Sequence, residues 1–225
     1  MPQPTPRQIS LFKAFLFALC LVPAAWLGWR FLNDDLGANP IEALIRGLGD
    51  WGLRFLLVTL AVTPARKLFG WHWLLRFRRM LGLYAFAYVF LHLSGYIVLD
   101  QFFDWHEIGK DILKRPFITV GMMAFLLLIP LAATSTNAMI RRLGGKQWQA
   151  LHRFVYVIGC LGVLHFWWMV KLDIREPALY AVILAVLLGL RVWWYRQDQR
   201  LKRQAAMPTL KPGARIIPIV ARKPH

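Results

Sequence analysis

Long apolar runs with almost no charged residues constrain this chain more than any other feature. Residues 80–99 form a run of 20 residues in which His92 is the one ionisable side chain other than tyrosine. A helix needs about 20 apolar residues to cross the hydrocarbon core of a bilayer. Similar runs cover residues 14–29, 117–136, 154–170 and 178–195, and a weaker run covers residues 46–63. The sequence therefore predicts an all-α integral membrane protein, built as a bundle of six helices.

The composition excludes the main alternatives. Hydrophobic residues make up 58% of the chain and charged residues 17%, whereas a soluble globular domain has about 45–50% and about 25%. A disordered basic protein would not contain 14% aromatic residues. Six spans occupy most of the 225 residues, so the chain has no room for a separate soluble catalytic domain.

The first two runs are less regular than the others. The first follows a basic stretch, as in a signal peptide, but it continues to residue 31 without a clean small-x-small cleavage site, so a retained helix is expected. The second contains Arg46, Asp50 and Arg54, which are spaced four residues apart. This spacing places the three charges on one helical face, where they can neutralise one another within the membrane.

The net charge of +17 is distributed unevenly. The N-terminus, the loops at residues 64–79 and 137–153, and the tail from residue 191 together hold 20 of the 28 basic residues and a single acid, Asp198. The positive-inside rule then predicts that both termini are cytoplasmic. The expected organisation is a cytoplasmic N-terminus (1–13), a six-span membrane domain (14–195) and a basic cytoplasmic tail (196–225). This account of the charge does not require nucleic acid, and we expect no nucleic-acid partner.

The cysteines and glycine motifs limit the possible cofactors. Cys20 and Cys160 both fall within apolar runs, so each is expected to be a small buried residue outside any disulfide. The sequence has no Cys-x-x-Cys-His, no cysteine cluster, no Gly-x-Gly-x-x-Gly and no P-loop. Covalently attached heme, iron–sulfur clusters and a dinucleotide-binding fold are therefore not expected.

Two histidines lie within the predicted spans, where ionisable groups are costly and usually functional. At a rise of about 1.5 Å per residue, His92 and His165 both lie near the outer third of their helices and can face each other across one iron. His152 precedes His165 by 13 residues and Arg78 precedes His92 by 14, which predicts a second tier about 20 Å away. Thirteen residues leave His152 and His165 about 140° apart on an ideal helix. Either the fifth helix is distorted or His152 lies on its frayed start.

Imidazole binds iron, copper and zinc, but a zinc site needs three or four ligands that converge on one point. Two opposed imidazoles in a flat slot between helices instead suit a b-type heme. Small residues that could open such a slot are Gly82, Ala85 and Gly95 on the third helix and Gly159 and Gly162 on the fifth. Basic side chains available to the heme propionates at the inner tier are Arg78, Arg79 and Arg153.

Three segments resemble a known family. Residues 78–92 (RRMLGLYAFAYVFLH), 144–156 (GGKQWQALHRFVY) and 164–168 (LHFWW) look like the MsrQ (YedZ) family, the heme-binding membrane subunits of the bacterial periplasmic methionine sulfoxide reductase system. The chain is more distantly similar to the ferric reductase-like transmembrane domain of NADPH oxidases. That resemblance implies b-type heme (heme b) between the third and fifth helices, with His92, His165 and His152 as iron ligands. The larger family has histidine where this chain has Arg78. The resemblance therefore leaves two questions open: the chain binds one heme or two, and Arg78 either ligates iron or pairs with a propionate.

The resemblance also implies a function. Family members take electrons from the quinol pool and pass them across the inner membrane to a periplasmic molybdopterin enzyme, MsrP, which repairs methionine sulfoxide in proteins. They are also described as binding FMN. The basic cytoplasmic surface of this chain could also receive a cytoplasmic flavin reductase as the donor. The chain is then an electron-transfer subunit rather than an enzyme. The alternatives are a stand-alone ferric or quinone reductase and a non-redox transporter with histidine proton relays.

The outer segment at residues 100–107 (DQFFDWHE) is a candidate docking surface for the partner, because it combines aromatic and acidic side chains. A belt of aromatic residues at the membrane interface would have the same composition.

Overall fold

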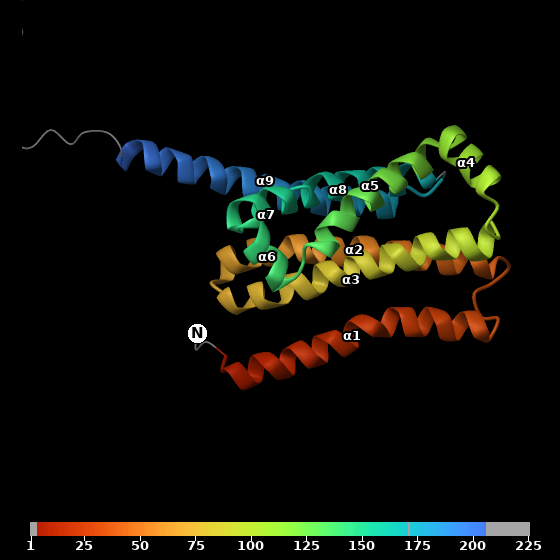
Figure 1. Cartoon of the computed structure of the whole chain (residues 1–225), viewed down its shortest axis with the longest axis horizontal. Coiled ribbons are helices and arrows are strands. Elements are labelled where there is room, and N and C mark those ends of the chain that lie inside the picture. Colours follow the sequence, from red (N-terminus) through yellow and green to blue (C-terminus); the bar gives the residue numbers. More distant parts are fainter. Residues whose placement is uncertain (1–3, 171, 206–225) are drawn as a thin grey trace, which may run out of the picture. The chain divides into compact units, whose positions relative to one another are not determined.

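The computed structural model describes residues 4–170 and 172–205, and every regular element in these residues is helical. The predicted all-α class is therefore confirmed for this part of the chain. The long helices are α1 (Pro6–Leu32), α2 (Pro40–Phe69), α3 (Leu75–Gly95), α5 (Pro116–Ala133), α8 (Val155–Met169) and α9 (Arg175–Ala205) (Figure 1). The short elements are the 3-10 turn η1 (His72–Leu74), the π-helical turn η2 (Tyr96–Asp100), α4 (Trp105–Lys114), α6 (Asn137–Leu143) and α7 (Gly145–His152).

Five helical stretches are long and apolar enough to cross a membrane, which indicates a multi-pass membrane protein. These stretches are Pro6–Leu32, His72–Asp100, Pro116–Ala133, Gly145–Met169 and Arg175–Ala205. Helix α2 is 30 residues long but is not among them. Its first half contains Glu42, Arg46, Asp50 and Arg54, which lower its hydropathy. The sixth span and the cytoplasmic location of the termini stay predictions.

The chain divides into two compact units, residues 1–188 and residues 189–225. The first unit contains every helix up to the first half of α9. The described part of the second unit is the remainder of α9, which continues as helix to Ala205. Residues 196–205 of the predicted basic tail are therefore helical, and the rest of that tail lies outside the described residues.

Within the first unit, α2 packs along α3 and α5 packs along α8 (Figure 1). The contact between α2 and α3 is close because Gly52 faces Val89, where a Cβ atom on the glycine would lie 2.8 Å from the valine Cγ2. Leu53, Leu56 and Leu60 are buried at helical spacing along α2. These two helix pairs provide the framework for the histidines.

Helix α1 is attached to α3 by tyrosine hydroxyls. Tyr88 is 2% exposed, and its hydroxyl donates to the carbonyl of Cys20 (2.7 Å) and accepts from the N–H of Ala24 (2.9 Å). In an uninterrupted helix these two backbone groups would bond to each other, so the hydroxyl is inserted into α1 beside its internal proline. Tyr84 also donates to the carbonyl of Phe17 (2.9 Å). Polar bonds thus anchor a helix that buries few of its own side chains.

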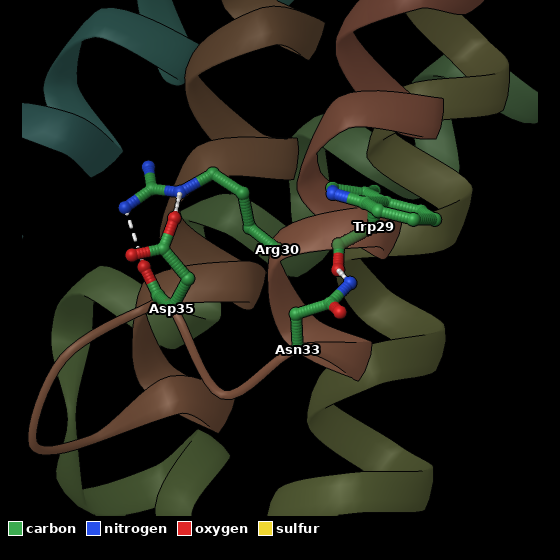
Figure 2. Close-up of polar contacts among 4 residues, drawn as sticks. All are labelled: Trp29, Arg30, Asn33 and Asp35. Carbon is green, nitrogen blue, oxygen red and sulfur yellow. Dashed lines mark hydrogen bonds and ion pairs between the residues drawn. The ribbon is translucent and has the colours of Figure 1, made fainter.

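Local polar contacts stabilise the C-terminal end of α1 (Figure 2). Arg30 donates through Nε to the carboxylate of Asp35 at 3.0 Å, and through Nη2 to the backbone carbonyl of the same residue. The side-chain amide of Asn33 donates to the carbonyl of Trp29 at 2.7 Å. The Trp29 carbonyl is one of the last four of α1, which a helix end leaves without an intrahelical partner, whereas Asp35 lies in the connection that follows. The chain then turns into α2, which begins at Pro40 after the Asn39 cap.

A helix break lies at the start of the fifth predicted span, residues 154–170. Helix α7 ends at His152, residues 153–154 form a turn, and α8 begins at Val155. Of the two alternatives for the 13-residue spacing, the structure shows an interruption that places His152 and His165 on different helices. Their relative orientation therefore does not follow ideal helical geometry.

The two cysteines differ in burial. Cys20 is buried, as expected, in the part of α1 that Tyr88 contacts. Cys160 was expected to be buried and is exposed on α8, so that prediction was wrong. The reason is that the lipid-facing and protein-facing sides of a membrane helix are both apolar, and hydropathy does not distinguish them.

Candidate functional site

His92 of α3 and His165 of α8 lie next to each other inside the first unit. Their ring centroids are 6.2 Å apart, and the ring planes make an angle of 79°. Imidazole nitrogen binds a metal such as Zn²⁺ at about 2.0 Å, so two imidazoles on opposite sides of one first-row metal ion have centroids on the order of 6 Å apart. The spacing of the two rings therefore fits a single metal ion between them.

Hydrogen bonds to the backbone show that Nδ1 carries a proton in both imidazoles. The Nδ1 atom of His92 lies 2.8 Å from the carbonyl oxygen of Ile45 on α2, and the Nδ1 atom of His165 lies 2.6 Å from that of Phe117 on α5. A carbonyl oxygen only accepts, so Nδ1 carries a proton in each ring, and Nε2 keeps its lone pair in the neutral imidazole. Metal-binding histidines are typically held in this way.

Each histidine also lies against a glycine. A Cβ atom on Gly49 would be 2.9 Å from the Nδ1 of His92, and a Cβ atom on Gly121 would be 2.8 Å from the Nδ1 of His165. Gly49 follows Ile45 by one helical turn. Gly121 and Phe117 have the same spacing, so one carbonyl–glycine arrangement occurs twice, once between α2 and α3 and once between α5 and α8. Sequence reasoning missed both glycines, because the carbonyls of Ile45 and Phe117 that accept from the imidazoles are identified only by the structure.

Both rings border a cavity of about 680 Å³, within the range of about 300–1,000 Å³ typical of cofactor sites. Most of its lining is apolar and comes from α2, α3, α5 and α8, including Leu53, Leu56, Val89, Met122, Phe125 and Ile158. Charged side chains also line it, namely Glu42, Arg46, Asp50, Asp100 and Arg115. Arg46 pairs with Glu42, and Arg115 pairs with Asp111 at 3.1 Å. The cavity thus combines an apolar interior and two imidazoles, which suit a flat apolar group that binds a metal ion, with three acids and two acid-paired arginines, and the arginines are the side chains there that can bind carboxylates.

The glycines that border the cavity are mostly not those expected from the sequence. Gly162 borders it, together with Gly49, Gly52 and Gly121, whereas the other predicted residues, Gly82, Ala85, Gly95 and Gly159, do not. Added Cβ atoms at Gly82, Gly95 and Gly159 would instead meet Thr59, Ile45 and Leu184. These glycines permit helix packing, which is their commoner role in membrane helices.

His152 lies apart from this cavity. Its Nε2 is 3.1 Å from the hydroxyl of Thr134, which itself donates to the carbonyl of Pro130 at 2.6 Å. The hydroxyl therefore accepts from His152, and the Nδ1 of that ring is the unprotonated nitrogen in the neutral form. Trp148 stacks on the imidazole with centroids 3.8 Å apart. Arg78 of α3 is near enough for its positive charge to act on His152.

The other two arginines expected at the inner tier are exposed. Arg79 donates to the side-chain oxygen of Asn137 on α6 at 2.6 Å. Arg153 lies in the turn between α7 and α8. Neither borders the cavity shared by His92 and His165.

The predicted outer docking segment spans the end of η2, a turn and the start of α4. Phe102 and Phe103 in the turn have φ values of 47° and 62°, a region that bulky residues rarely adopt, and Phe102 is 75% exposed. The side chain of Asp104 caps α4 by accepting from two of its N–H groups. Asp100, which precedes the turn, borders the cavity. The exposed aromatic pair is therefore adjacent in sequence to the cavity lining.

Comparison with known proteins agrees with this architecture. The family model described as "Ferric reductase like transmembrane component" matches residues 48–163, a segment that contains Gly49, His92, Gly121 and His152 and ends two residues before His165.

Three relatives are similar over most of the chain. Each carries the name protein-methionine-sulfoxide reductase heme-binding subunit MsrQ. The relative from Azospira oryzae is 55% identical over 98% of this chain and 93% of its own length. The one from Herminiimonas arsenicoxydans is 54% identical over 92% and 95%. The one from Rhodospirillum rubrum is 62% identical over 81% and 88%.

Proposed function

Because the chain belongs to the MsrQ family of heme-binding subunits of protein-methionine-sulfoxide reductase, we propose that it is a transmembrane electron-transfer subunit with a b-type heme between His92 and His165. One observation supports this proposal above the others: two imidazoles within the membrane helices border one cavity at a centroid distance of 6.2 Å, and both have Nε2 available.

The residues around the cavity have distinct roles in this proposal. His92 and His165 would hold the heme iron through Nε2, and the carbonyls of Ile45 and Phe117 orient the two imidazoles. The apolar lining would exclude water, and Arg46 and Arg115 would bind the propionate carboxylates. When bound, the heme iron accepts and releases one electron at a time.

A second heme is proposed at His152. Thr134 fixes the orientation of this ring, and the neighbouring Arg78 supplies a positive charge for a propionate or a further ligand to iron. Two hemes at different depths would divide the membrane crossing into two shorter electron transfers.

The donor and acceptor are proposed from the family. Electrons enter from the cytoplasmic side, from the quinol pool or from a reduced flavin, including FMN bound to this chain or a cytoplasmic flavin reductase. They leave to a periplasmic molybdopterin enzyme of the MsrP type, which catalyses the repair of methionine sulfoxide in proteins. The chain would then lie in the bacterial inner membrane with six spans and both termini cytoplasmic, as its charge distribution predicts.

The decisive experiment is the absorption spectrum of the detergent-purified full chain. A Soret band and a dithionite-reduced b-type α band are expected, and the heme-to-protein ratio distinguishes one heme from two. His92→Ala and His165→Ala should each remove the same heme, whereas His72→Ala, a change at an exposed histidine, should remove none. A colourless wild-type protein would contradict the proposal and favour a transporter.

Electron transfer to the partner is tested by reconstitution. Reduced chain in vesicles should be reoxidised by methionine sulfoxide when the purified periplasmic enzyme is present. Fast reoxidation by ferric chelates or quinone without that enzyme would instead support a stand-alone reductase.

A further inference from the structure

The planes of His92 and His165 are nearly perpendicular, at 79°. The two rings are held by different helices, since His92 bonds to Ile45 on α2 and His165 bonds to Phe117 on α5. The Nδ1–H group of each bond lies in the plane of its imidazole. The bond therefore fixes the rotation of the ring about the axis along which Nε2 would bind a metal ion. The angle between the rings is therefore set by two separate backbone carbonyls.

The glycines restrict the rings further. Gly49 and Gly121 allow each Nδ1 to approach the backbone of the facing helix, because a Cβ atom at either position would lie under 3.0 Å from that nitrogen. A ring that rotated about its metal bond would lose its hydrogen bond to the carbonyl. In the apolar interior of the cavity, the N–H group would then remain without a partner, which is costly. The perpendicular arrangement is thus held by bonds on both sides.

We infer that Ile45 and Phe117, through their carbonyls, and Gly49 and Gly121, through their missing side chains, are positioning residues that hold the two axial imidazoles of one heme perpendicular. This inference rests on the proposed heme site. Each imidazole donates π electron density to the iron d orbital that lies perpendicular to its plane. Two iron d orbitals can accept this π density. Parallel rings both act on the same one of these orbitals, so the two orbitals differ in energy, whereas perpendicular rings act on one orbital each and leave the two nearly equal in energy.

The consequence is measurable by electron paramagnetic resonance. Near-degenerate orbitals give low-spin ferric heme a strongly anisotropic signal with one dominant high-g feature. Parallel imidazoles give a rhombic spectrum with three resolved lines. The oxidised full chain in lipid nanodiscs should show the strongly anisotropic signal. His152→Ala should retain this signal, since His152 does not border the cavity.

The spectrum of the unaltered chain and of His152→Ala tests ring orientation without any change at the site. A rhombic low-spin signal from the heme retained in His152→Ala would overturn this inference and leave the proposed heme site intact. Absence of any b-type absorption would instead contradict the proposed function. The two failures are therefore distinguishable.

Glycine variants test the positioning role. Gly49→Ala and Gly121→Ala should each displace one ring and change the shape of the high-g feature, while the absorption spectrum still reports bound heme. Gly82→Ala is the matched control on α3, because its Cβ would meet only Thr59 at an ordinary 3.7 Å, and it should leave the signal unchanged. Heme-loaded Gly49→Ala and Gly121→Ala proteins with wild-type signals would overturn the role of the glycines. Loss of heme from either variant, with Gly82→Ala unaffected, would support it.

Discussion

Gly121 of α5 and His165 of α8 lie so close that a Cβ atom on the glycine would be 2.8 Å from the Nδ1 of the histidine. Real Cβ atoms essentially never come that near another atom. The same relationship between Gly49 and His92, at 2.9 Å, shows that both histidines depend on a gap in the side chains of the facing helix.

A larger side chain at residue 121 should therefore empty the site. We expect Gly121→Leu to reduce the heme-to-protein ratio by the full amount attributed to the His92–His165 site, because the leucine would occupy the space of the imidazole. The ratio is measured by pyridine hemochrome on purified protein. Gly28→Leu is the control, since a Cβ atom at Gly28 on α1 meets nothing within 4 Å. Full heme content in Gly121→Leu would contradict the site.

The two arginines of the cavity should strengthen heme binding. A hydrogen bond to a charged group contributes about 1.5–3 kcal/mol, and 1.4 kcal/mol corresponds to a factor of ten. We expect Arg46→Gln and Arg115→Gln each to accelerate heme loss to apomyoglobin on the order of tenfold or more. Lys110→Gln, at a partly exposed pair with Glu107 on α4, should not. Equal rates in all three variants would show that the propionates lie elsewhere.

The two histidine tiers should be separable. His152→Ala should leave the His92–His165 heme bound, because His152 bonds to Thr134 and does not border that cavity. If the chain binds two hemes, this change removes one of them, and Thr134→Val should shift the reduction potential of the same heme without removing it. Redox titration followed at the α band measures both effects. Loss of both hemes in His152→Ala would contradict two independent sites.

The attachment of α1 should depend on Tyr88 more than on Tyr84. Tyr88→Phe keeps the ring but removes two hydrogen bonds and leaves the Cys20 carbonyl and Ala24 N–H without that partner, whereas Tyr84→Phe removes one bond. We expect Tyr88→Phe to lower the free energy of unfolding by roughly 1–2 kcal/mol, and Tyr84→Phe by less. Denaturation in mixed SDS and detergent micelles measures both. A larger effect of Tyr84→Phe would reverse this assignment.

Much of this architecture was predictable because it depends on local composition. Uncharged runs of sufficient length predicted the five apolar spans, since backbone groups in lipid must be satisfied within a helix. His92 and His165 were identifiable as candidate site residues because ionisable groups within the membrane are rare. The positions of both histidines along their helices indicated that they could lie at one depth.

The details of the site were less predictable because they depend on how helices face one another. Gly95 and Gly159 are as favourable for a slot as Gly49 and Gly121 when only the sequence is considered, yet neither borders the cavity, and their nearest neighbours are Ile45 and Leu184. Cys160 shows the same difficulty, because an apolar run does not reveal which side of a helix faces lipid. The interruption between α7 and α8 likewise has no proline or glycine at residues 153–154 to mark it.

The sequence by itself determined that this chain is a helical membrane protein with two histidines inside its spans, because the cost of burying charge and unpaired backbone in lipid is a local property. The tertiary structure alone decided that His92 is held by Ile45 and Gly49 and that His165 is held by Phe117 and Gly121. These contacts join residues more than 40 positions apart. They depend on the rotation and close approach of neighbouring helices, which hydropathy does not specify.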